Sequence, residues 1–156
     1  MNPTKATVEG RNLIISRTFQ APREQVFRAW TDPLHLPQWW GPQGFTITVQ
    51  EIDIRPGGVW RYVMHGPDGT DYDNLVTFLD IQAPSRIEYK HGDFENDKHF
   101  RVTVTLEEQG QSTLLTMIMQ FPTVDALNQT IQQVGAIEGA QSTMERLNQQ
   151  LSKIAP

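Results

Sequence analysis

The chain has 156 residues, no cysteine and a formal net charge of −5 at pH 7. This length suits one domain with a sizeable apolar core, and the lack of cysteine excludes disulfides, thiolate nucleophiles and cysteine-ligated metals. The 13 Lys and Arg residues form no basic stripe, and no apolar run approaches the ~20 residues of a membrane span. We therefore expect no nucleic acid and no membrane span, and, because residues 1–10 form no basic and apolar leader, a cytoplasmic location.

The first predicted elements are a strand and a short helical region. Residues 12–19 are rich in β-branched side chains and predict a strand. Proline at the start of residues 22–31, followed by apolar side chains at spacings of three and four, predicts an amphipathic helix. The pair Asp32-Pro33 ends it, because the residue before a proline disfavours the helical conformation. A short turn over residues 33–38 then leads to Trp39-Trp40.

From residue 45 the apolar pattern changes to a period of two, which predicts a meander of antiparallel hairpins. The expected strands cover residues 45–54, 59–65, 72–81, 86–91, 99–107 and 112–121. The alternation changes parity near Glu51, which indicates either a switch of face or a β-bulge. Proline and glycine at 55–58 and 66–69 predict tight turns.

After residue 122 the apolar period becomes helical again. Thr123 is a suitable N-cap, Gly135 interrupts the pattern, and apolar residues then recur at a 4-3-4-3 spacing. This stripe consists of Ala140, Met144, Leu147, Leu151 and Ile154. It requires an apolar surface, which the inner face of the sheet supplies. The predicted class is α+β, with a curved antiparallel sheet of about six to seven strands wrapped around a long C-terminal helix. Two short helices follow the first strand, and the single domain has its core at about residues 13–154.

Several motifs occur in the order and spacing of a known family. They are Phe27 to Pro33, Trp39-Trp40-Gly41-Pro42, Arg55-Pro56-Gly57-Gly58, Gly66 to Asn74 and Gly135 to Gly139. Through them the chain resembles, from about Leu13 to Leu151, the single-domain bacterial homologues of the C-terminal domain of the heat-shock-chaperone ATPase activator. These proteins belong to the START-like (SRPBCC-type, helix-grip) superfamily. The resemblance implies a helix-grip fold with a cavity used for carriage, cyclisation, hydrolysis or chaperone contact.

Aromatic and methionine side chains supply the lining that a flat or apolar ligand needs. The candidates for ligand contact are Trp39, Trp40, Trp60, Tyr62, Met64, Tyr72, Asn74, Tyr89, His91, Met117, Met119, Phe121 and Met144. Ordinary core packing is the alternative for each, and the Trp39-Trp40 pair is expected mainly to close one end of the sheet. The polar groups expected to orient a ligand are Tyr62, Tyr72, Asn74 and His91.

The remaining polar residues form no catalytic or metal motif. His91 and His99 flank a loop whose acidic residues lack the glycine and bidentate glutamate of a calcium site, and no zinc ligand set is fixed. We interpret this loop, Gly92 to Lys98, as a solvated hairpin tip. No nucleophile elbow or phosphate-binding glycine loop is present. Catalytic residues stay unassigned, and neither a metal nor a cofactor is expected.

The expected function is the binding of a small apolar or aromatic molecule between the sheet and the C-terminal helix. Two alternatives stay open. One is a chaperone-associated interaction module of the stress response, and the other is a small cyclase- or hydrolase-type enzyme that uses the same cavity. The protein partners considered are a chaperone and a second copy of the chain.

Overall fold

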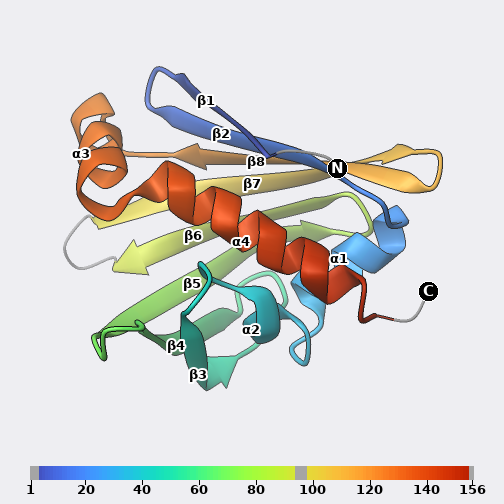
Figure 1. Cartoon of the computed structure of the whole chain (residues 1–156), viewed down its shortest axis with the longest axis horizontal. Coiled ribbons are helices and arrows are strands. Elements are labelled where there is room, and N and C mark those ends of the chain that lie inside the picture. The colour runs from blue at the N-terminus through green and yellow to red at the C-terminus, as the bar shows by residue number, and fades with distance from the viewer. Residues whose placement is uncertain (1–3, 94–97, 155–156) are drawn as a thin grey trace.

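The computed structural model describes residues 4–93 and 98–154 (Figure 1). The strands are β1 (Lys5–Glu9), β2 (Asn12–Phe19), β3 (Thr46–Ile52), β4 (Val59–His65), β5 (Asp71–Gln82), β6 (Arg86–Asp93), β7 (Lys98–Gln109) and β8 (Ser112–Gln120). The helices are α1 (Arg23–Thr31), α2 (Leu36–Trp39), α3 (Val124–Val134) and α4 (Ala136–Leu151). The strands form one antiparallel sheet in the order β1-β2-β8-β7-β6-β5-β4-β3. Figure 1 shows α4 lying across one face of this sheet, with α3 leading into one end and α1 near the other.

The predicted α+β class and the helix gripped by a sheet are confirmed, but the described residues form a sheet of eight strands, where about six to seven were predicted. The additional strand is β1, which pairs with β2 from Lys5↔Ser16 to Glu9↔Asn12. Most of its side chains are exposed. A short edge strand with little buried surface carries no apolar alternation, so its sequence does not reveal it.

Local signals of the sequence correspond to observed turns and caps. The sheet register shifts between Val49 and Glu51, which confirms a bulge there. The Thr123 side chain accepts a hydrogen bond from the Ala126 amide and caps α3. Gly135 has a φ of 62°, a left-handed conformation that favours glycine, and it separates α3 from α4.

The predicted apolar stripe of α4 packs into the core. Its members Ala140, Met144, Leu147 and Leu151 are all buried, as is Ile154 after the helix. They belong to the same buried cluster as sheet residues such as Leu13, Ile15, Val102, Val104 and Leu115. The helix is therefore held by burial of one face. No helix in the described part of the chain combines the length and the apolarity needed to cross a membrane.

A buried arginine also joins the sheet to α4. Arg17 lies on the buried face of β2 and is 7% exposed. Its Nη1 atom donates to Glu145 Oε2 of α4 at 2.9 Å, and its guanidinium carbon lies 5.3 Å from the centroid of the Phe19 ring. The pair fixes the position of α4 along β2, because a buried guanidinium requires its acceptor.

We expect Glu145→Ala to lower the free energy of unfolding by about 1–3 kcal/mol, since it leaves the Arg17 charge buried without a carboxylate. Adding Arg17→Met should recover most of this loss, because the buried charge is then absent as well. Urea unfolding of both variants measures the effect, with Glu107→Ala at an exposed strand position as the control. Equal losses in the single and the double variant would contradict this account.

Candidate cavity between the sheet and helix α4

A cavity of about 260 Å³ lies between α4 and the inner face of the sheet. The sheet and the residue after β8 contribute Met64, Tyr89, His91, Phe100, Met117, Met119 and Phe121. The helices and the segment after α2 contribute Trp30, Trp39, Trp40, Gly41, Pro42, Thr130, Ala136, Gly139, Ala140, Thr143 and Met144. Among the described residues, the lining is therefore mostly aromatic, methionine or small, and includes no Asp, Glu, Lys or Arg.

The cavity exists because α4 changes side-chain size along its inner face. The N-terminal half presents small residues to the cavity, at positions 136, 139, 140 and 143. The C-terminal half presents leucines, and Leu147 is fully buried. Small side chains do not reach the sheet as leucines do, so space remains at the N-terminal end of the helix.

Most residues predicted to contact a ligand surround this space. Those in its wall are Trp39, Trp40, Met64, Tyr89, His91, Met117, Met119, Phe121 and Met144. The structure places the other four outside the wall. Trp60 and Tyr62 are fully buried and contact Trp40. Tyr72 is 47% exposed, and Asn74 bonds to a wall residue. Ligand contact by the wall residues stays a prediction.

A chain of hydrogen bonds runs from the cavity wall to His91. Trp40 Nε1 donates to the Tyr62 hydroxyl at 2.8 Å, and that hydroxyl lies 3.4 Å from His91 Nε2. His91 Nε2 lies 3.0 Å from Asn74 Oδ1, while Asn74 Nδ2 donates to the Tyr72 carbonyl at 3.1 Å. Because a carbonyl can only accept, the Tyr72 carbonyl orients the Asn74 amide with its oxygen toward the imidazole. The network thus assigns the His91 proton to Nε2 and leaves Nδ1 as an acceptor.

Burial keeps the ionisable groups of the wall neutral. Desolvation lowers the pKa of His91 to about 4. It raises the pKa of Tyr89 well above the ordinary value, and the nearby Tyr62 raises it further. Burial also raises the pKa of Tyr62, with the Trp40 hydrogen bond opposing it. At neutral pH the wall therefore offers hydrogen-bond donors and acceptors but no charge.

Arg146 of α4 holds the elbow, which we define as residues 38–45 between α2 and β3. Its Nη2 atom donates to the Gln38 carbonyl at 3.0 Å. Its Nη1 atom lies within hydrogen-bond distance of the carbonyls of Trp40 (3.0 Å), Gly41 (2.9 Å), Pro42 (3.2 Å) and Phe45 (3.3 Å). The planar guanidinium can serve acceptors in two directions at once. The elbow, which contributes several wall residues, is thus fixed to the helix beside the cavity.

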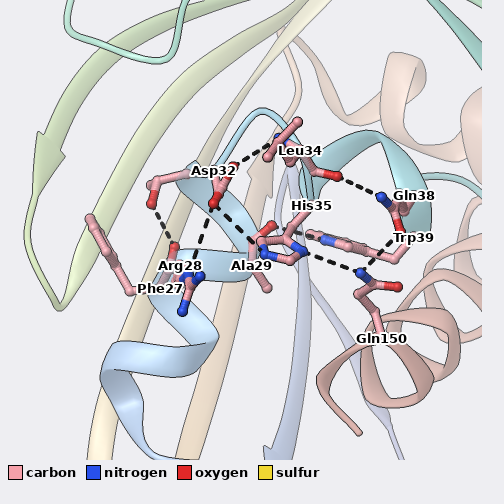
Figure 2. A network of polar contacts seen from close by, with 10 residues as sticks. Phe27, Arg28, Ala29, Asp32, Leu34, His35, Gln38, Trp39 and Gln150 are labelled. Atoms are coloured by element: carbon pink, nitrogen blue, oxygen red, sulfur yellow. Dashed lines mark hydrogen bonds and ion pairs between the residues drawn. The ribbon is translucent and has the colours of Figure 1, made fainter. Parts of the chain in front are cut away.

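A second anchor lies one turn further along α4 (Figure 2). Gln150 is 6% exposed and donates from Nε2 to Gln38 Oε1 at 3.2 Å and to His35 Nδ1 at 3.4 Å. The other nitrogen of the His35 ring lies 3.7 Å from Asp32 Oδ2, and Trp39 Nε1 donates to a carbonyl of α1 at 3.0 Å. These bonds hold α1, α2 and α4 in one arrangement.

Tryptophan rings pack against one another beside the elbow. Trp30 meets Trp39 and Trp40 at an angle, with ring centroids 4.8 and 5.7 Å apart, and Trp40 meets Trp60 at 5.1 Å. The indole N–H groups of Trp30 and Trp60 are buried and have no hydrogen-bond partner in the described part of the chain. Edge-to-face contacts between the rings stabilise the cluster beyond the apolar area that it buries. The cluster therefore supports the elbow by packing.

Several wall residues were not predicted: Trp30, Gly41, Pro42, Phe100, Thr130, Ala136, Gly139, Ala140 and Thr143. For those of α4 a signal existed, because small residues that share a helix face with large ones indicate unfilled space. Arg146 carried no such signal, since its acceptors are backbone carbonyls of a segment distant in sequence.

Charged side chains of β3, β4 and β6 form ion pairs with one another. Glu88 Oε2 lies 2.9 Å from Arg86 Nη2, and Arg61 faces Glu51 at 3.6 Å. The predicted hairpin tip at residues 92–98 falls largely outside the described residues. Within those that are described, no group of three or more His, Asp or Glu side chains is arranged to hold a metal ion.

Comparison with known proteins decides the family. The sequence model described as "Activator of Hsp90 ATPase homolog 1-like protein" matches residues 20–152. The chain belongs to this family. No curated protein sequence matches it significantly.

Solved structures of bacterial proteins resemble this chain over nearly its whole length. A protein from Arthrobacter aurescens is 28% identical with a TM-score of 0.87, covering 97% of this chain and 92% of its own. A protein from Mycobacterium smegmatis is 27% identical with a TM-score of 0.83, covering 98% of both chains. A protein from Staphylococcus epidermidis is 28% identical with a TM-score of 0.82, covering 97% of this chain and 96% of its own.

Replacing Arg146 with lysine tests whether the guanidinium group holds the elbow against α4. A single ammonium cannot serve all five carbonyls. Arg146→Lys should therefore lower the free energy of unfolding by about 1–3 kcal/mol and speed amide exchange in residues 38–45. Urea unfolding and hydrogen exchange followed by mass spectrometry measure both, with the exposed Arg101→Lys as control. If amide exchange in the elbow were unchanged, Arg146 would not be what holds it in place.

The pKa of His91 predicts a pH dependence of stability. Its folded pKa of about 4 lies below the ordinary value of 6.5, so the unfolded chain binds more protons between these values. The free energy of unfolding should then decrease as the pH falls from about 6.5 toward 4, by at most about 3 kcal/mol. The His91→Gln variant lacks this contribution. Subtracting its free energy of unfolding from that of the unmodified protein at each pH removes the contributions of all other titrating groups. Parallel pH profiles of the two proteins would refute it.

Proposed function

We propose that this protein binds a small apolar or aromatic molecule in the cavity between α4 and the sheet. The observation that carries the proposal is a cavity of about 260 Å³ whose described lining is mostly aromatic, methionine or small. A cavity of roughly 150 Å³ accommodates benzene, so this one suits a ligand of on the order of ten non-hydrogen atoms.

The wall favours binding because much of it is already in place. Arg146 and Gln150 fix the elbow, so less conformational freedom remains to be lost when a ligand orders the site. The methionines Met64, Met117 and Met119 line the same space, and their flexible side chains can adapt to the outline of a ligand. The free energy of binding would come mainly from apolar area removed from water, about 25 cal/mol per Å².

Contact with a chaperone is a second candidate, supported by the family match, since the family description names an activator of the Hsp90 ATPase. A cyclase- or hydrolase-type reaction has less support. The pKa of His91 is about 4, which makes it a weak general base at neutral pH. The cytoplasmic location and association with a second copy stay predictions of the sequence.

Filling the cavity tests the proposal. Uncharged bicyclic aromatics such as naphthalene and indole should raise the melting temperature of the unmodified protein and quench its tryptophan fluorescence. Ala140→Leu places a larger side chain in the cavity wall, so it should melt at the same or a higher temperature and bind these compounds at least about tenfold more weakly.

Gln141→Leu is the matched control, because it makes a comparable change at the next, exposed position of α4. It should bind the aromatics as the unmodified protein does. The proposal fails if no compound binds the unmodified protein, or if Ala140→Leu binds as tightly as the Gln141→Leu control. Stimulation of a chaperone ATPase by both variants alike would instead favour the second candidate.

A further inference from the structure

Strand β6 carries the ionisable polar groups of the cavity wall. Tyr89 and His91 both line the cavity and are two residues apart, so their side chains leave the same face of the strand about 7 Å from each other. Of the other polar groups of the wall, the Thr130 and Thr143 hydroxyls donate to carbonyls of their own helices. The Trp39 and Trp40 N–H groups donate within the protein, and the Trp30 N–H is fully covered. Polar recognition of a ligand therefore depends mainly on Tyr89 and His91.

His91 presents an acceptor. Its Nε2–H is engaged by Asn74 Oδ1 at 3.0 Å, and the Asn74 amide is in turn oriented by the Tyr72 carbonyl. Nδ1 makes no hydrogen bond to the described part of the chain. This atom is also not fully buried, so it is accessible from the cavity. This uncovered lone pair on a residue of the cavity wall can accept a hydrogen bond from a ligand or from water.

Tyr89 presents a donor. The residue as a whole is only 3% exposed. Its hydroxyl makes no hydrogen bond to the described residues, and the hydroxyl oxygen is not fully buried. Its burial holds the hydroxyl in the protonated form. A ligand oxygen is the natural partner for this proton.

We propose that the cavity selects neutral hydroxylated ligands, phenols or alcohols of about ten non-hydrogen atoms, whose O–H donates to His91 Nδ1 and whose oxygen atoms accept from the Tyr89 hydroxyl. This inference rests on the proposed function. A hydrocarbon would leave both polar groups unpaired. A carboxylate would present acceptors only, and it would be buried without a countercharge, because no Asp, Glu, Lys or Arg is among the described wall residues.

Three compounds of one shape test the selection: naphthalene, 2-naphthol and 2-naphthoate, titrated by tryptophan fluorescence and calorimetry at pH 7.5. We expect 2-naphthol to bind at least tenfold more tightly than the other two. Tyr89→Phe should reduce 2-naphthol affinity about threefold to tenfold and leave naphthalene affinity unchanged. Tyr72→Phe removes the same hydroxyl from an exposed tyrosine outside the wall and should change neither affinity.

His91→Leu should abolish the preference for 2-naphthol over naphthalene. If this variant does not fold, the nitrogen chemical shifts of the His91 ring in the unmodified protein give an independent result. They should report an Nε2–H tautomer, and 2-naphthol should shift the Nδ1 resonance most. An Nδ1–H tautomer would overturn the inference.

The outcomes separate the two proposals. If none of the three compounds binds, the proposed function itself fails. If naphthalene binds as tightly as 2-naphthol, or if 2-naphthoate binds most tightly, the cavity binds ligands but the selection for hydroxyl groups is wrong.

Discussion

The structure depends on the change of side-chain size along the inner face of α4. At its C-terminal end leucines reach the core, and Gln25 Nε2 of α1 donates to the Leu151 and Ile154 carbonyls, so this end of the helix is held against the core and α1. At the N-terminal end Ala136, Gly139 and Ala140 do not fill the same distance. Because packed interiors move as rigid units, the close contact at one end keeps the other end apart. The cavity is therefore a consequence of where the large residues are.

Such a space could still close if the elbow collapsed into it, and the polar anchors of α4 oppose this. Arg146 and Gln150 lie one turn apart on the same side of the helix and bind the backbone and side chains of residues 35–45. Both use groups that would be costly to bury unpaired. Moving the elbow inward would break these bonds together. The opening is thus maintained by hydrogen bonds that lie outside the cavity.

Much of this arrangement follows from patterns in the sequence, and the exceptions have a common cause. Strand residues such as Tyr89 and His91 reveal their inward direction by alternation, and the α4 stripe reveals its burial by period. Tyr62 shows the limit of such patterns. Alternation predicts that its side chain points inward, but its hydroxyl accepts a hydrogen bond from Trp40 and the residue does not line the cavity. The role of Arg146 is likewise not predictable from periodicity, because its acceptors are backbone carbonyls far away in the sequence. Periodicity specifies a face, whereas these contacts depend on the distance between elements remote in sequence.

Three unfavourable local features lie in the cavity wall or against it, although buried unpaired atoms also occur elsewhere in the described chain, on Asn12, Arg17 and Arg23. The pKa of His91 is depressed by burial to about 4, and the N–H groups of Trp30 and Trp60 have no conventional acceptor in the described part of the chain. The opposite end of α4 has leucine packing and a satisfied glutamine instead. A sequence that optimises stability alone would fill the void and pair these groups. Since departures from local consistency tend to coincide with functional sites, their position beside one cavity supports a binding role for it.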